Sequence, residues 1–506
     1  MIPSVKIASL ENVKATAVDD TLASRIIAGV YPRSQYQFLN ESALERVTDA
    51  NWYYHFYNID GQMWTYPKMD YRPTIMPVNL ARWFVKKRSS WMFEVAPDIE
   101  CPAESFDAPE KMEADGYVPS PKQKKANDSA SAREQLLYST WKQNRFEYKL
   151  IEAGKDHFIG GLVALRILYI NGGIKLLFAP TQEVFPIPDV TDPYSFSTIH
   201  FCSYLDNEQT IWKQTWELLP GEDGNTYCYL TEGTYDTALH EKEMIHKQTN
   251  MGIDFIPVVL FPNDSLTGDP FGNSYLKDLI PLFEQYNHAL SDAADSLKFN
   301  EFAIKVLLGA SPDAEKNLKV APGAVWNITG DSADAKVLES SFSYQTALAD
   351  FLTRLENLTH MIGEVPDITP DRIKGFGLVS GVALKLLYSD LVSATQNSWR
   401  IWKDGLVLAN EYILRMLETY ESHPEITSYD TRIIPHLPLP ENEAEKINME
   451  VTKLGASLQS VHGALQELGE KYPERLIAQL ITERERFAGV MGKTLTPQEK
   501  AIISGA

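Results

Sequence analysis

The chain is organised around SYLKDLIPLFEQYNHALSDAADSL, which occupies residues 274–297. Apolar side chains recur in this stretch at spacings of three and four, a period that places them on one face of a helix. The apolar stripe comprises Leu276, Leu279, Ile280, Phe283, Tyr286, Leu290, Ala294 and Leu297. At about 1.5 Å per residue, a helix of about 22 residues would form a rod of roughly 33 Å.

A second stretch carries the same kind of stripe after an interruption. Its apolar residues are Tyr344, Leu348, Phe351, Leu355, Leu358 and Ile362. Between the two stretches, residues 301–343 contain a strand-like run and the helix breakers Pro312 and Pro322. The sequence therefore predicts an elongated helical hairpin with a small module at its tip. Side-by-side copies of the chain could cover the stripes, or an ordinary large core could bury them, and the pattern alone allows both.

A third long helix is predicted after the hairpin. Residues 365–380 read VPDITPDRIKGFGLVS, a loop-like stretch with prolines and glycines. Ser380 is a candidate N-cap for the helix that follows, and no proline interrupts the chain from Asp371 to His423. We therefore expect one helix of about forty residues, with Gly405 as a candidate kink.

The first 272 residues combine helices with strands. Residues 162–178 predict a β-hairpin, because Asn171-Gly172-Gly173 suits a tight turn with positive φ. Residues 103–133 are polar and predict a surface loop, and residues 133–153 predict a helix. Several further strand-like runs favour an antiparallel sheet. They lie at residues 197–204, 210–218, 226–231 and 256–261.

Composition is that of a globular protein and argues against some functions. Of 506 residues, 44% are hydrophobic and 23% are charged, and 47 basic against 68 acidic residues give a net charge of −21. This acidity opposes tight, sequence-independent DNA binding, which requires clusters of lysine and arginine. Lys86-Lys87-Arg88 is the most basic run, but it is more typical of a solvated helix face than of a DNA contact. The scattered cysteines predict a reducing compartment, and no apolar run is long enough to predict membrane insertion.

Three partial motifs fall short of a catalytic signature. Gly492-Lys493-Thr494 ends like a phosphate-binding loop, but Phe487 stands where that motif requires glycine. His240-Glu241 begins like a zinc-protease helix, but Met244 replaces the second ligand. Gly377-Leu378-Val379-Ser380-Gly381 places its serine one position away from that of a nucleophile elbow. We therefore expect no catalytic residue, no metal site and no cofactor.

Taken in order, several features resemble the portal proteins of tailed bacteriophages, in particular those of long-tailed phages that package by a headful mechanism. They are the run Phe271-Gly272-Asn273-Ser274-Tyr275-Leu276, the two helices with their excursion, and Ser380-Gly381-Val382-Ala383-Leu384-Lys385. The resemblance implies an α+β portal fold that assembles into a homododecamer, a ring of about twelve subunits. It implies a channel at one capsid vertex for packaging, retention and ejection of double-stranded DNA, and no enzymatic activity.

The resemblance also implies a division of the chain. It consists of a mixed α/β wing at residues 1–272, a first stem helix at 273–300, a small α/β clip at 301–342, a second stem helix at 343–364, a tunnel loop at 365–380, a long wing helix with a linker at 381–440, and a helical crown at 441–506. The protein would be assembled in the bacterial cytoplasm and become part of the virion.

Individual residues acquire roles only through this resemblance. The DNA-facing residues of the tunnel loop would be Asp367, Asp371, Arg372, Lys374, Gly375, Phe376 and Gly377. The clip would contact partners through Lys316, Lys319 and Trp326. The stem helices would pack through Phe283, Leu290, Leu297, Phe351, Leu355 and Leu358. The partners would be the terminase large subunit, a head–tail connector, capsid and scaffolding proteins, and DNA held weakly and without sequence preference, with no membrane.

Two other functions remain open on the residues alone. One is a scaffold or adaptor that binds a partner through the helical hairpin. The other is an enzyme with dispersed carboxylates, for which Asp367 and Asp371 are the first candidates. A ring of about twelve subunits would distinguish the portal interpretation from both alternatives.

Overall fold

The chain divides into two compact units. The computed structural model describes residues 36–62, 64, 72–103, 112–113, 116–117, 121–189, 191–205, 210–221, 223–236, 241–301, 304–308, 334–338, 345–367, 386–421, 423, 426–438, 443–456, 458–469, 476–477 and 479–483. The first unit comprises Met1–Arg88, Lys155–Leu162 and Asn263–Asp367, and the second comprises Ser89–Gly154, Val163–Pro262 and Ile368–Ala506. Two of the five boundaries fall within helices, α4 (Leu80–Phe93) and α6 (Phe146–Gly160), so each of these helices contributes residues to both units.

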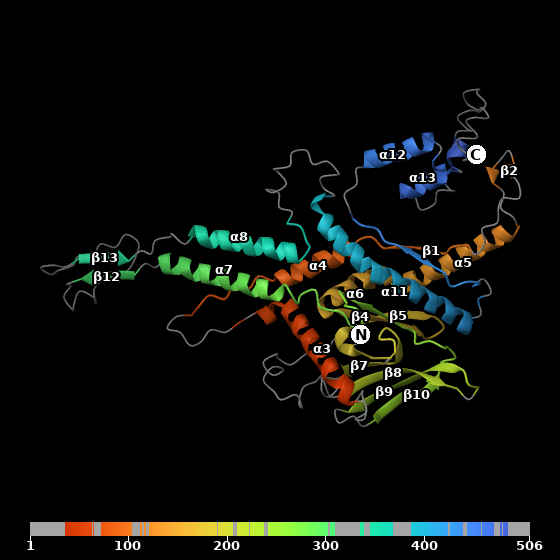
Figure 1. Ribbon diagram of the computed structural model, residues 1–506, viewed down its shortest axis with the longest axis horizontal. Helices are drawn as coiled ribbons and strands as arrows, with labels where there is room; N and C mark the ends of the chain where they lie inside the picture. The colour runs from red at the N-terminus through yellow and green to blue at the C-terminus, as the bar shows by residue number, and fades with distance from the viewer. Residues whose placement is uncertain are drawn as a thin grey trace. The chain divides into compact units, whose positions relative to one another are not determined.

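The first unit consists mainly of helices. It contains α3 (Tyr36–Tyr57), the 3-10 helix η2 (Ile59–Gln62), α7 (Ile280–Glu301) and α8 (Gln345–Ile362). Figure 1 shows α7 and α8 side by side. Between them in sequence, β12 (Ile304–Leu308) pairs antiparallel with β13 (Asp334–Leu338). The two long helices therefore lie where the periodicity predicts them, and a strand pair connects them.

Aromatic residues from three helices form the core of the first unit. Phe283 of α7 is fully buried, and its ring centroid lies 6.4 Å from that of Phe56 on α3. The ring centroid of Phe84 on α4 lies 5.6 Å from the ring centroid of Phe283. Pro281 stands in the first turn of α7, where its missing N–H removes no helical hydrogen bond. The apolar period of the sequence is thus sufficient to identify the centre of this core.

The second unit contains two sheets. Most of the strands that the sequence predicts lie in these two sheets. One is an antiparallel meander in the order β10-β9-β8-β7-β6, and the other has the order β11-β4-β5. The predicted hairpin is confirmed, since β4 pairs with β5 across a turn in which Asn171 and Gly172 have φ of 55° and 74°. The strands are β4 (Leu162–Tyr169), β5 (Ile174–Pro180), β6 (Val184–Pro188), β7 (Phe196–Leu205), β8 (Thr210–Pro220), β9 (Thr226–Asp236), β10 (Glu241–Asn250) and β11 (Val258–Pro262). A 3-10 turn, η3 (Thr181–Glu183), connects β5 to β6.

Helices and short strand pairs complete the second unit. The helices are α5 (Pro121–Gln143), α11 (Ser389–Glu421), α12 (Glu443–Gly455) and α13 (Val461–Glu467). The strand pairs are β1 (Asp98–Glu100) with β14 (Arg432–Ile434), and β2 (Met112–Glu113) with β3 (Gly116–Tyr117). α11 packs against β11, β14 and α5. Its buried Trp402 stacks on Phe261 of β11 with ring centroids 4.3 Å apart.

The structure departs from the sequence expectations in several places. The predicted loop at residues 103–133 is wrong from Pro121 onward, because α5 begins there with proline in its first turn. Within α5, Arg133 is fully buried and donates hydrogen bonds to the carbonyls of Ser428 and Pro102. α11 covers residues Ser389–Glu421, and the predicted start of this helix with its proposed N-cap Ser380 lies outside the described residues. Strand β10 was not predicted, because its charged residues show no apolar alternation.

Gly405 allows α11 to approach β11 closely. A Cβ atom at this position would lie 2.3 Å from Cε1 of Phe261, well inside van der Waals contact. The glycine therefore serves the packing of a continuous helix.

We predict that Gly405→Ala lowers the thermal midpoint, because displacing Phe261 should cost about 1–3 kcal/mol, more than the gain of up to about 1 kcal/mol in helix propensity. Gly455→Ala is the matched control, since nothing lies within 4 Å of its added Cβ and only the propensity gain applies. Scanning calorimetry of both variants checks this, and equal midpoints would contradict the packing explanation.

Candidate functional site

The helical hairpin of α7 and α8 is the feature of the chain most suited to a functional surface. The two helices are antiparallel, and the hydroxyl of Tyr286 on α7 donates to Oε1 of Glu356 on α8 at 3.0 Å. Leu355 of α8 is buried, with 7% of its surface exposed. The hairpin is therefore held by both polar and apolar contacts within one chain.

A polar stripe on α7 binds an extended segment of the chain. The backbone N–H groups of Thr74, Met76 and Val78 donate to Asp295, Ser291 and Asn287 in turn, at 2.9–3.1 Å. The spacing fits because two extended residues span about 6.6 Å and four helical residues rise about 6.0 Å. Alternate amides of the segment therefore meet every fourth residue of the helix. We call this arrangement the polar ladder.

Two further groups extend the polar ladder at its ends. The ammonium of Lys298 donates to the hydroxyl of Thr74 and lies 3.7 Å from Oδ1 of Asp295. At the other end, the side-chain amide of Asn287 donates to Gln62, which in turn donates to Asn79 at 2.8 Å. Because buried amides without partners are costly, these bonds fix the position of the segment on α7.

The C-terminal end of α8 is held by a second group of contacts. The hydroxyl of Tyr275 donates to the carbonyl of Gly363, and Nη1 of Arg88 lies 3.5 Å from Oε2 of Glu364. The guanidinium of Arg88 lies 5.3 Å from the ring centroids of both Phe158 and Tyr275. Burial lowers the pKa of Arg88, while Tyr275 and Glu364 act in the opposite direction. We call Arg88, Tyr275 and Glu364 the α8 clamp.

His360 also stabilises this end of α8. Its Nδ1 donates to the carbonyl of Val365 at 2.8 Å, and its ring packs beside Trp83 and Phe84. Gly363 is required in the same turn, because a Cβ there would lie 2.7 Å from the ring of Phe84. The chain therefore leaves α8 from a fixed position toward Asp367, which is the last residue of the predicted loop that the structure describes.

Some of the predicted stem residues are buried within a single chain, and the others are exposed on its surface. Phe283 and Leu355 are buried and Leu290 is half-buried. Large apolar side chains of the hairpin that remain exposed are Leu297 (55%), Phe351 (42%), Leu358 (42%), Met361 (67%) and Ile362 (42%). We call these five residues the outer apolar face. Large exposed apolar residues that gather on two paired helices are typical of an interaction surface.

Most other predicted functional residues lie outside the described parts of the chain. These are Lys316, Lys319, Trp326, Asp371, Arg372, Lys374, Gly375, Phe376 and Gly377. Asp367 is described and is half-buried at the end of the α8 clamp. The roles assigned to these residues stay predictions.

The described residues also bear on metal and membrane binding. Within them, no three His, Cys, Asp or Glu residues lie together in a way that could hold a metal ion. In the same ranges, no helix combines the length and the apolar character that crossing a bilayer requires. Met244, which stands where a zinc-protease helix would have its second ligand, lies on strand β10 and not on a helix.

Sequence reasoning missed the residues that position the hairpin. The basic run Lys86-Lys87-Arg88 is typical of a solvated helix face, but Arg88 is buried while the two lysines are exposed. Asp295 does not belong to the apolar stripe of its helix, yet it is only 8% exposed. Asn287, Ser291 and Asp295 recur at a spacing of four, and this is the one sequence feature that could indicate the polar ladder. Short polar residues at that spacing normally indicate a helix face exposed to solvent.

Comparison with known proteins supports one family. A family model described as phage portal protein, SPP1 Gp6-like, matches residues 37–470 of the chain. A search of curated proteins found no match. The matched region contains the helical hairpin, both sheets and α11.

The polar ladder leads to a prediction with a pH signature. Asp295→Ala should lower the free energy of unfolding by about 1–3 kcal/mol at pH 7, because the Thr74 amide loses its acceptor. Burial would raise the pKa of Asp295, but bonds from Thr74 and the charge of Lys298 outweigh it, and the pKa is lowered. The stabilisation is therefore present above about pH 4 and is lost as the pH falls through the lowered pKa.

Urea unfolding at several pH values measures this effect. Asp292→Ala, at an exposed position of the same helix, serves as the control and should change stability by less than about 0.5 kcal/mol. Equal effects of the two substitutions at pH 7 would contradict the polar ladder.

Proposed function

This chain belongs to the SPP1 Gp6-like family of phage portal proteins, and from that premise we propose that it forms a ring of about twelve copies around a DNA channel. Membership in the family gives it a role in phage DNA packaging. We propose a structural role without enzymatic activity, at one vertex of the capsid, after assembly in the host cytoplasm. The ring would let double-stranded DNA enter during packaging, retain it and release it at ejection.

The outer apolar face is the observation that carries this proposal. A single chain leaves Leu297, Phe351 and Leu358 between 42% and 55% exposed. Full burial of such a side chain contributes about 1.5–3 kcal/mol, so covering several of them would stabilise association. Because one hairpin has two sides, each copy can contact a neighbour on either side, and such head-to-tail contacts close into a ring. The hairpin would then be the stem.

The α8 clamp supports the proposed tunnel loop. The predicted loop, residues 365–380, begins directly after the contacts of Arg88 and Tyr275, and these contacts fix the position at which the chain enters it. We propose that Lys374 and Phe376 face the DNA, with the other predicted loop residues around them. A single cation from each subunit, repeated around a ring, would bind phosphates weakly in salt. Weak contacts suit a channel in which DNA must move.

The strand pair β12–β13 supports the proposed clip. It connects the far ends of α7 and α8, and residues 309–333 lie between its strands in sequence. We propose that Lys316, Lys319 and Trp326 contact the terminase large subunit during packaging and a head–tail connector afterwards. The wing, the crown and their boundaries stay as predicted from the sequence, with capsid and scaffolding proteins as further partners.

The first prediction concerns assembly. Phe351→Asp with Leu358→Asp should prevent ring formation, because each interface would bury unpaired charges at a cost of several kcal/mol. Both positions are exposed in the single chain, so the variant should remain folded. Native mass spectrometry gives the oligomeric state, and circular dichroism gives the fold.

Thr353→Asp is the matched control for this experiment. Thr353 is exposed on α8 away from the apolar stripe, and its hydroxyl donates to the carbonyl of Ala349. This control should assemble normally. Rings of unchanged stability from the double variant would remove the outer apolar face from the interface.

The second prediction concerns the tunnel loop. Lys374→Glu with Phe376→Ala should leave ring assembly unchanged, since neither residue belongs to α7 or α8. Packaging or retention should fail late, when internal pressure is highest, so filled particles should be rare. Normal yields of filled, infectious particles would exclude the loop from the mechanism. Lys277→Glu, a change at an exposed lysine of the first unit, controls for charge alone.

A further inference from the structure

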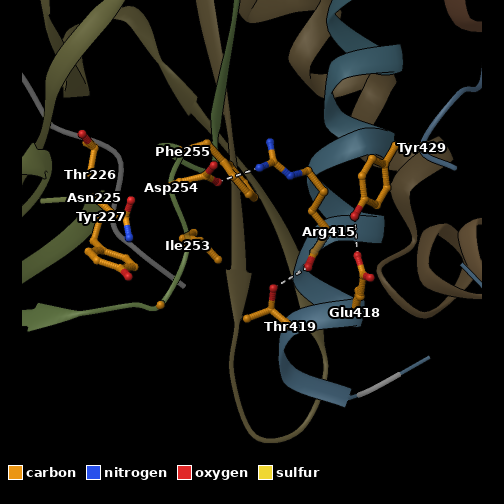
Figure 2. A pocket seen from close by; sticks show the side chains of 11 residues that line it. Asn225, Thr226, Tyr227, Ile253, Asp254, Phe255, Arg415, Glu418, Thr419 and Tyr429 are labelled. Atoms are coloured by element: carbon orange, nitrogen blue, oxygen red, sulfur yellow. Dashed lines mark hydrogen bonds and ion pairs between the residues drawn. The ribbon is translucent and has the colours of Figure 1, made fainter. Parts of the chain in front are cut away.

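Two arginines of the chain pair with carboxylates in different ways. In the second unit, Nη2 of Arg415 lies 2.6 Å from Oδ1 of Asp254 in the wall of a surface cavity, as Figure 2 shows. The backbone of Asp254 does not have a positive φ. In the first unit, Nη1 of Arg88 lies 3.5 Å from Oε2 of Glu364, and Glu364 has a φ of 51°. Of these two carboxylates, that of Glu364 alone belongs to a residue in the left-handed region.

Glu364 stands at the position where α-helices most often end with a left-handed residue. The N–H of Val365 donates to the carbonyl of His360 at 3.2 Å. The N–H of Glu364 donates to the carbonyl of Met361 at 3.3 Å. These two bonds define a Schellman motif, in which the left-handed residue is usually glycine because a Cβ atom is disfavoured there. A glutamate at this position is therefore strained, and another contact must hold it.

The glycine of this turn stands one residue too early to relieve the strain. A Cβ atom at Gly363 would lie 2.7 Å from Cε1 of Phe84, so the space beside α4 requires glycine there. Gly363 itself does not have a positive φ. The hydroxyl of Tyr275 donates to its carbonyl and so fixes the peptide that joins it to Glu364. The left-handed conformation therefore falls to Glu364.

Arg88 supplies the contact that holds Glu364. The Arg88 side chain is 6% exposed, and in the described parts of the chain Glu364 is the one carboxylate that pairs with it. Because a buried cation without a partner is strongly unfavourable, Arg88 keeps the Glu364 carboxylate at the protein surface, although the glutamate side chain is 52% exposed. The next residue, Val365, is buried, and its carbonyl accepts from Nδ1 of His360 at 2.8 Å. The strained residue is therefore held from both sides.

We propose that Glu364 is a positioning residue for the tunnel loop: its ion pair with Arg88 keeps its backbone left-handed, and this conformation sets the direction in which the chain leaves α8. A right-handed conformation at Glu364 would instead continue the helix toward Pro366, whose ring disfavours a helical residue before it. The two conformations of one residue therefore send the chain in different directions. The inference rests on the proposed function of residues 365–380 as a loop that faces the DNA.

Two substitutions that remove the same charge separate strain from charge. Glu364→Gln loses the attraction to Arg88 but stays disfavoured at positive φ, so the turn should open. Glu364→Gly also loses the ion pair, but glycine adopts the left-handed conformation by itself, so the turn should persist. Hydrogen exchange of the full chain, measured by mass spectrometry on peptides that cover residues 360–365, should be at least about tenfold faster in the glutamine variant and within about threefold of the wild type in the glycine variant. Equal exchange in the two variants would overturn the inference.

Substitution of Arg88 tests the other half of the ion pair. Arg88→Met should accelerate the same exchange at least about tenfold, and adding Glu364→Gly should restore it, because glycine needs no partner to stay left-handed. Arg415→Met with Asp254→Gly is the matched control, since it removes an ion pair whose carboxylate residue has no positive φ, and it should leave exchange at the end of α8 unchanged. Circular dichroism checks that each variant is folded. Failure of glycine to restore slow exchange would reduce Arg88 to a packing role and overturn the inference.

The yield of DNA-filled particles assembled with each variant is the functional readout. The yield should fall with Glu364→Gln and recover with Glu364→Gly, while native mass spectrometry shows intact rings in both. Normal yields from intact rings whose turn has opened would overturn the positioning role and leave the proposed function in place. Wild-type chains that form no ring would overturn the proposed function, and with it the role of Glu364 in DNA passage.

Discussion

The pairing of Thr74, Met76 and Val78 with one polar stripe of α7 is the constraint on which the arrangement of the hairpin depends. Backbone amides in an extended segment must find acceptors when they are buried, and α7 offers one at every fourth residue. Because that stripe is committed to the chain itself, the orientation of α7 is fixed. The orientation in turn leaves Leu297 exposed while Phe283 is buried in the core. The apolar surface that neighbouring copies could contact is therefore a consequence of the hydrogen bonds that polar groups form within one copy.

Apolar periodicity was sufficient to predict the two hairpin helices, and the turn chemistry of Asn171-Gly172 was sufficient for the β4–β5 hairpin. Both signals are local, since each depends on residues a few positions apart. Long-range polar contacts could not be predicted in this way. Arg88 was read as solvated because its partners, Tyr275 and Glu364, lie far away in sequence. Gly405 was read as a candidate kink because nothing in α11 reveals that Phe261 packs against it.

The candidate site was predictable only in outline. The sequence identified six stem residues but could not distinguish those that stabilise one chain from those left for neighbours. Leu355 and Leu358 differ by one helical turn, yet the first is 7% exposed and the second 42%. Burial against the core of the first unit decides this difference. The residues proposed for the clip and most of those proposed for the tunnel loop lie outside the described parts, so their roles depend on the family alone.

Electron cryomicroscopy of the purified full-length chain tests the central claim most directly. The account predicts closed rings of about twelve subunits in which α7 and α8 of each copy surround the central channel and contact their neighbours through Phe351 and Leu358. Monomers of 57.1 kDa at concentrations sufficient for imaging would contradict it. Rings in which the hairpin lies away from the channel, with the outer apolar face exposed to solvent, would contradict it equally.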